Sequence, residues 1–145
     1  MEIKKILVPV CGNSVDEEVI KLACDLAKKS KAQIYVVYII EVPRTLPLDA
    51  QIDLEIEKAE KLLTQAEDIS AEQDCEIETD LFQAREAGPG IVDEAVERKV
   101  ELIIMGLPYK KRLSVFNLGN ASRYVLRESP CPVLLYREAI SLRGE

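Results

Sequence analysis

The chain has 145 residues, of which 48% are hydrophobic and 31% are charged, and its formal net charge is −7. This length and composition predict a single globular domain, and no apolar run approaches the ~18 residues that a membrane-spanning helix needs. The acidic balance argues against non-specific nucleic-acid binding. Histidine is absent, which excludes Ser-His-Asp catalysis and histidine-based zinc sites.

The cysteines and the start of the sequence both predict a cytoplasmic protein. The four cysteines are far apart in sequence, so they form neither a C-x-x-C redox pair nor a metal knuckle, and they are expected to be free thiols in a reducing compartment. The first residues run directly into a strand-like segment and lack the layout of a signal peptide.

Charge is distributed unevenly along the chain. Residues 41–80 hold 13 acids and 3 bases, whereas residues 102–127 hold 5 bases and no acid. A basic stretch in an acidic protein favours a site for an anion. The alternative for its three consecutive bases, Lys110, Lys111 and Arg112, is a loop that faces solvent.

The pattern begins with a strand and a helix. Residues 3–10 form a β-branched apolar run that ends at turn residues 11–13. Ser14 and Glu17 then have the spacing of a capping box, which predicts a helix that continues to about Lys29.

A second strand and a long helix follow. Residues 33–40 are apolar nearly throughout, as in strands that are buried on both faces. Pro43 and Pro47 mark a loop, after which a helix is expected from Asp49 to about Gln73, with its acids on the face opposite an apolar stripe.

The second half repeats the alternation. Strands are expected at 76–82, 102–105 and 133–136, and helices after the turn at 88–90 and over 120–128. Strands that alternate with helices predict an α/β fold: a five-stranded parallel doubly wound sheet, strand order 3-2-1-4-5, with helices on both faces. A ligand crevice is expected at the carboxyl ends of strands one and four, where the order reverses.

Three common occupants of such a crevice lack their motifs here. A phosphoacceptor receiver needs acids after the first strand, a dinucleotide fold needs G-x-G-x-x-G, and a flavin-type loop is rich in Ser and Thr. After the first strand this chain has Cys11-Gly12-Asn13 instead.

The fourth strand leads into a different glycine pattern. Gly106-Leu-Pro-Tyr109 is followed by nine residues and then by Gly119-Asn-Ala-Ser122. Gly106 ends a strand where the backbone passes close to a ligand, and Gly119 opens a helix whose N–H groups face phosphates. This pattern resembles the universal stress protein family, as do the segments 5–13 and 129–136. The resemblance covers residues 3–137 as one domain, followed by a polar tail at 138–145.

The resemblance implies an altered site for ATP or another adenine nucleotide. Gly106 and Gly119 match the family's motif, whereas Cys11 replaces the acid that holds the ribose, Tyr109 replaces the second glycine and Asn120 replaces the final Ser or Thr. The residues implied to contact nucleotide are Pro9, Val10, Cys11, Ile39, Met105, Gly106, Tyr109, Gly119, Asn120, Ala121 and Ser122.

The function implied by the resemblance is non-enzymatic, in stress response or signalling, with weak nucleotide binding. One alternative is a protein-interaction module whose crevice is plugged by Tyr109. A less favoured alternative is an ATP-hydrolysing enzyme, because residues 102–127 supply no acid that could bind a metal ion or act as a base. The family also implies a homodimer, here through the edge strand Val133, Leu134, Leu135 and Tyr136.

Overall fold

The computed structural model describes residues 2–108 and 119–139. Its five strands form one parallel sheet in the order β3-β2-β1-β4-β5, which confirms the predicted α/β fold. The elements are β1 (Lys5–Pro9), α1 (Asp16–Ser30), β2 (Gln33–Glu41), α2 (Asp53–Glu72), β3 (Ile77–Ala84), α3 (Ala87–Arg98), β4 (Leu102–Leu107), α4 (Asn120–Glu128) and β5 (Val133–Arg137).

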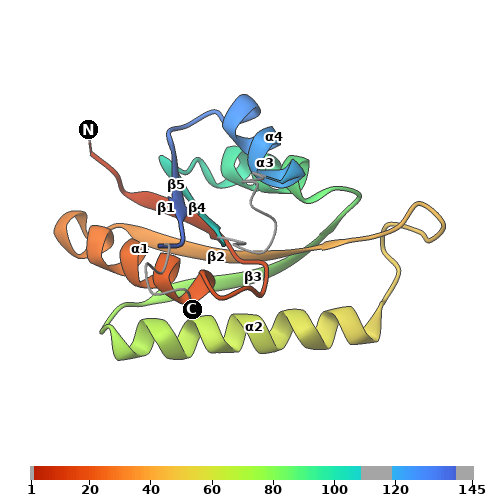
Figure 1. The fold of residues 1–145 in the computed structure, drawn as a ribbon, viewed down its shortest axis with the longest axis horizontal. Coiled ribbons are helices and arrows are strands. Elements are labelled where there is room, and N and C mark those ends of the chain that lie inside the picture. Colours follow the sequence, from red (N-terminus) through yellow and green to blue (C-terminus); the bar gives the residue numbers. More distant parts are fainter. Residues whose placement is uncertain (1, 109–118, 140–145) are drawn as a thin grey trace.

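The sheet lies between two helical layers. Helices α1 and α2 cover one face, and α3 and α4 cover the other (Figure 1). Successive side chains of a strand point to opposite faces. Ile34, Val36 and Tyr38 of β2 therefore pack in the core beneath α1 and α2, whereas Tyr35 and Val37 pack beneath α3. The buried apolar runs of the sequence are the strands that are covered on both faces.

The predicted capping box at the start of α1 is wrong. The helix begins at Asp16, and no side-chain cap hydrogen bond is found there within the described part of the chain. The Ser14 hydroxyl instead donates to the Glu138 carboxylate, with an O···O distance of 2.6 Å. The Asp16 carboxylate accepts the backbone N–H of Gly12 at 2.7 Å and fixes the turn that follows β1. Glu138 is also tied to β4, because its N–H donates to the Leu107 carbonyl at 2.8 Å.

Two other predicted boundaries shift. Helix α2 begins at Asp53 rather than at Asp49, and the segment 88–90, expected as a turn before α3, lies inside the first turn of that helix. Proline is tolerated there because the first turn of a helix has N–H groups without helical partners.

The connection between β2 and α2 projects from the body of the molecule (Figure 1) and is held by side chains from β3 and its end. Arg85 Nη1 donates to the carbonyl oxygens of Pro43 and Leu46, both at 2.8 Å. Gln83 Nε2 donates to two further carbonyl oxygens of the connection, at 2.7 and 2.9 Å. These bonds replace the backbone pairing that an irregular segment lacks.

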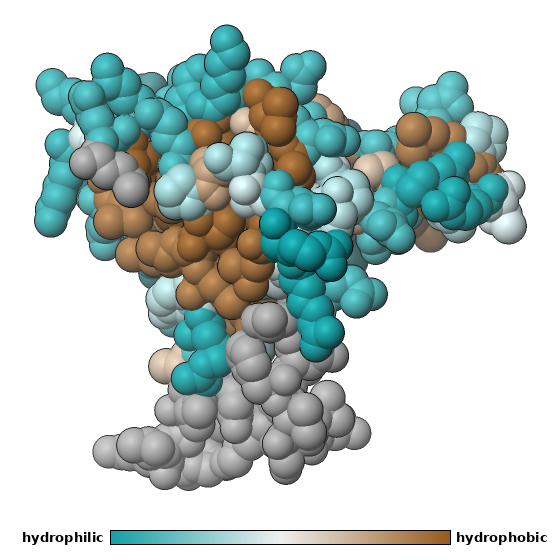
Figure 2. Space-filling model, turned by 90° about the horizontal axis from the view of Figure 1, so that it is seen from above, coloured by the Kyte–Doolittle hydropathy of each residue, from teal (hydrophilic) through white to brown (hydrophobic). Residues whose placement is uncertain are grey.

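None of the helices in the described ranges is long and apolar enough to cross a membrane. The surface is mixed: Figure 2 shows an apolar area on the face seen from above, bordered by hydrophilic side chains.

Candidate functional site

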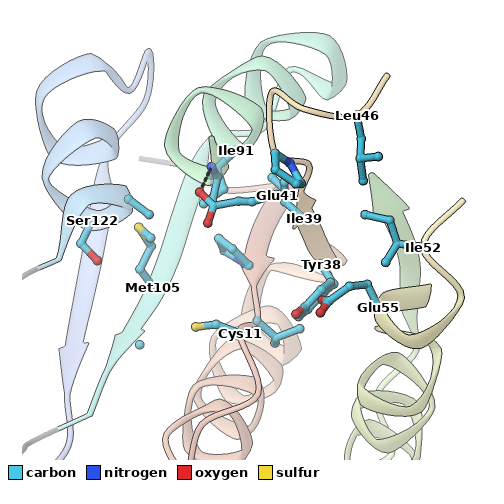
Figure 3. Close-up of a pocket in the computed structure, with 16 residues that line it drawn as sticks. Cys11, Tyr38, Ile39, Glu41, Leu46, Ile52, Glu55, Ile91, Met105 and Ser122 are labelled. Carbon is cyan, nitrogen blue, oxygen red and sulfur yellow. Dashed lines mark hydrogen bonds between the residues drawn. The ribbon is translucent and has the colours of Figure 1, made fainter. Parts of the chain in front are cut away.

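A cavity of about 610 Å³ opens at the carboxyl ends of the central strands, at the position predicted from the strand order (Figure 3). It extends from the first turn of α4, across the ends of β4, β1 and β2, to the first turn of α2. Ligands of open α/β sheets bind at this place because two neighbouring connections leave the sheet in opposite directions there.

The structure brings most of the predicted residues together. Eight of them line the cavity: Pro9, Val10, Cys11, Ile39, Met105, Gly106, Ala121 and Ser122. Gly119 and Asn120 lie at the start of α4, and Asn120 lines a neighbouring hollow of about 410 Å³ between α3 and α4. Tyr109 lies outside the described residues.

The glycine motif does not indicate the rest of the cavity wall. It comes from the end of β2, the β2–α2 connection, α2 and α3, and it includes Tyr38, Glu41, Leu46, Ile52, Glu55 and Ile91. The alternation of side chains along β2 could have predicted Tyr38, because it places this side chain on the face of the sheet that α2 covers. No local signal marks Leu46 or Glu55, because the loop fold that brings them to the cavity depends on bonds from Arg85 and Gln83.

Cys11 lies at the end of β1 in surroundings that favour its neutral form. Although the residue is exposed at the surface, partial desolvation of its thiol, and after it the negative charge of Asp16, raises the pKa of Cys11 to about 11. Burial also raises the pKa of Asp16, although the N–H groups of Gly12 and Cys11 oppose that shift. Near neutral pH, Cys11 is therefore a protonated thiol, which is a weak hydrogen-bonding group and a poor nucleophile.

The two glycines of the motif have different structural roles. A Cβ atom on Gly106 would lie 2.7 Å from side-chain atoms of both Val15 and Val19, so packing against α1 explains the missing side chain there. Gly119 has φ 79° and ψ 161°, a conformation that is essentially restricted to glycine. A Cβ atom on Gly119 would meet none of the described residues within 4 Å.

The start of α4 has the properties of an anion site. Among the described residues, no side-chain hydrogen bond is found as a cap of this helix, and its first turn holds no acid. The N–H groups and dipole at such a terminus favour negative charge. The start of α3 differs, because its first N–H, on Ala87, donates to the Glu41 carboxylate at 2.9 Å (Figure 3).

The described wall of the cavity carries few charged groups. The described lining residues include two carboxylates, Glu41 and Glu55, and no Lys or Arg. Within residues 2–108 and 119–139, no three His, Cys, Asp or Glu side chains are grouped closely enough to hold a metal ion.

A parallel doubly wound sheet with an apolar cavity at its switch point is the arrangement in which α/β domains of this kind hold their ligands. The family model of the universal stress proteins matches residues 2–137 of the sequence. The chain therefore belongs to the universal stress protein family, as its motifs predicted.

Proteins similar to this chain come from more than one organism. A universal stress protein of Methanocaldococcus jannaschii is 29% identical over 141 residues, which cover 93% of this chain and 82% of that protein. The structure of a universal stress protein from Archaeoglobus fulgidus is 27% identical, with a TM-score of 0.73 and coverage of 91% and 92% of the two chains. Another from Archaeoglobus fulgidus, in complex with dAMP, is 24% identical, with a TM-score of 0.74 and coverage of 93% and 98%.

Proposed function

We propose that this chain binds an adenine nucleotide weakly and acts in stress response or signalling through that binding, without catalysing a reaction. The observation that carries the proposal is the cavity itself, which joins an apolar wall to the first turn of α4. An apolar wall suits a purine base, and a helix N-terminus suits phosphate.

The apolar wall and the size of the cavity support the binding of a purine base. Val10, Ile39, Ile91 and Met105 line it, and about 610 Å³ falls within the range of small-molecule pockets. The Archaeoglobus fulgidus relative in complex with dAMP supports the choice of an adenine mononucleotide. We expect the phosphate end at Ala121 and Ser122, which line the cavity at the start of α4, on the side opposite α2.

The same residues support weak binding. A protonated Cys11 is a poor acceptor for sugar hydroxyls, and the carboxylate of Glu41, which also lines the hollow beside Asn120 and Ala121, repels phosphate. The non-enzymatic character is supported by the raised pKa of Cys11, which leaves this thiol mostly un-ionised near neutrality. A cytoplasmic location is supported by the four free cysteines.

Calorimetric titration with ATP, ADP and AMP tests the proposal. We expect dissociation constants in the roughly micromolar to millimolar range, or about 4–8 kcal/mol. Ala121→Glu adds a carboxylate to the first turn of α4, where it stabilises the helix but repels phosphate, so binding is expected to fall while the melting temperature holds. Val96→Glu, on the exposed face of α3, is the matched control with the same charge change.

The interaction-module alternative predicts a different result. If Tyr109 plugs the crevice, the wild-type protein binds no nucleotide and Tyr109→Gly gains measurable affinity. If neither protein binds ATP, ADP or AMP, the nucleotide proposal is wrong. ATP hydrolysis that follows binding would contradict the non-enzymatic part alone.

A further inference from the structure

The cavity has a second polar end, beside α2 and remote from α4. It is made by the Tyr38 hydroxyl of β2 and the Glu55 carboxylate in the first turn of α2. Figure 3 shows the two groups pointing toward one another at the side of the cavity opposite Ser122. Neither residue belongs to the glycine motif, and neither contributes to the anion site at α4.

Tyr38 is a nearly buried polar side chain that faces this cavity without a partner. Its residue is 8% exposed. Among the described residues, its hydroxyl has no hydrogen-bond partner, and yet no buried side-chain oxygen is left unsatisfied. The hydroxyl must therefore open to the space of the cavity, while the ring is fixed in the core beneath α1 and α2.

Glu55 is placed by the start of α2 rather than by a partner side chain. It is half-buried, and it makes no ion pair or hydrogen bond within the described part of the chain. Ile52, one turn earlier, and Leu46 of the β2–α2 connection line the same end of the cavity. Apolar neighbours lower the local dielectric, which strengthens a hydrogen bond to the carboxylate and raises the cost of leaving it unmade.

The chemistry of this pair selects a particular kind of ligand group. An ionised carboxylate only accepts hydrogen bonds, and a phenol hydroxyl both donates and accepts. The pair therefore suits a group that offers N–H or O–H donors, and it repels phosphate. With phosphate at α4, the sugar hydroxyls or the amino group of the base would reach this end.

We propose that Tyr38 and Glu55 form a subsite that binds the hydrogen-bond donors of the nucleotide, either its sugar hydroxyls or the amino group of its base. The inference rests on the proposed nucleotide function and adds the residues that select the ligand. It also assigns a role to a carboxylate that would otherwise only weaken the binding of an anion.

Three ligands with one phosphate each separate the two sources of donors. AMP has both, IMP lacks the amino group and 2′,3′-dideoxyAMP lacks the sugar hydroxyls. Glu55→Gln keeps the shape and loses the charge, and we expect it to lower AMP affinity by about tenfold to a hundredfold, since hydrogen bonds to charged groups are the strong ones. Tyr38→Phe should lower AMP affinity by a smaller factor.

The pattern across the ligands assigns the donor. If Glu55 accepts from the sugar, AMP and IMP lose affinity in the Glu55→Gln variant and 2′,3′-dideoxyAMP does not. If it accepts from the base, AMP and 2′,3′-dideoxyAMP lose affinity and IMP does not. Glu57→Gln is the control, because Glu57 is exposed on the same helix and its loss changes the charge alone.

The overturning results are distinct from failure of the proposed function. If wild type binds AMP and the Glu55→Gln and Tyr38→Phe variants bind all three ligands as it does, the subsite is wrong and the nucleotide function stands. An equal loss for all three ligands overturns the subsite as well. If wild type binds none of the three ligands, the proposed function and this inference are both wrong.

Discussion

Cys11 stands at the junction between the turn after β1 and the cavity, and its chemistry is set by its surroundings. Partial desolvation contributes most to its raised pKa, and the Asp16 charge acts in the same direction. Asp16 in turn holds the turn through the N–H of Gly12. One carboxylate therefore both shapes the turn and suppresses the thiolate of Cys11.

Asp16→Asn should make Cys11 more reactive. The amide oxygen can still accept the N–H of Gly12, but the negative charge that disfavours the thiolate is gone, so the pKa of Cys11 falls. We expect the alkylation of Cys11 by iodoacetamide at pH 8 to be slow in wild type and roughly several-fold faster in the variant. Mass spectrometry of the labelled peptides measures this.

Cys131 serves as the internal reference for that experiment. It lies after α4 and contacts Ser129 rather than Asp16, so its alkylation rate should not respond to Asp16→Asn. An unchanged ratio of the Cys11 rate to the Cys131 rate would contradict the electrostatic account. In wild type, the alkylation rate of Cys11 should keep rising as the pH approaches about 11, the pKa of its thiol.

At the scale of the elements, the sequence predicts what depends on local pattern. All five strands and all four helices were expected, because apolar runs and amphipathic spacing reflect burial directly. Helix starts were less predictable. The Ser14 hydroxyl bonds to Glu138, which is 124 residues away, and no local pattern contains that contact. Val96, an apolar residue of α3, is nevertheless 58% exposed.

The residues of the candidate site also fall into a group that the sequence predicts and a group that it does not. The place of the crevice followed from topology, whereas the contact residues were those that the family resemblance implied, and eight of them do line the cavity. The wall formed by Leu46, Ile52 and Glu55 was not predicted, because it depends on how an irregular connection is held by Arg85.

Arg85→Gln should loosen the connection between β2 and α2. The guanidinium donates two 2.8 Å hydrogen bonds to carbonyls of this segment, and their loss should cost about 1–3 kcal/mol in the free energy of unfolding. Arg44 is exposed in the same segment, so limited trypsin digestion should cut after it faster in the variant. Arg127→Gln, at an exposed position of α4, is the control. Equal rates of trypsin cleavage after Arg44 in the two variants would contradict the role of Arg85 in holding the connection.

Gly106→Ala should destabilise the contact between β4 and α1. The new methyl group would lie 2.7 Å from the side chains of Val15 and Val19, and overpacking of this kind costs about 1–3 kcal/mol. The melting temperature should fall by about 2–4 °C per kcal/mol. Val19→Ala removes one of the clashing groups, so the double variant should recover part of the loss. If the alanine variant melts like wild type, α1 packing does not explain this glycine.

At the scale of the whole molecule, the cavity and the edge of the sheet are separate surfaces. The cavity opens at the carboxyl ends of the strands, whereas β5 is the edge strand, paired only with β4 among the described strands. Its residues Val133 to Tyr136 are all half-buried. Leu134 packs toward α1, and Leu135 packs toward α3 and α4. An apolar edge strand with unpaired backbone groups favours pairing with another chain.

We therefore propose that two chains pair antiparallel through β5 about a two-fold axis, which places the same edge of each chain against the other. Light scattering should give twice the 16.3 kDa mass of one chain at micromolar concentration.

Leu134→Lys and Leu135→Lys place like charges across the junction on opposite faces of the joined sheet, and each should shift the protein toward monomer because facing like charges are unfavourable. Val96→Lys introduces the same charge on exposed α3 and should remain dimeric. Nucleotide affinity should be little changed in all three variants, because none of these positions lines the cavity. A wild-type protein that is monomeric across the micromolar range would show that the β5 edge is not used in this way.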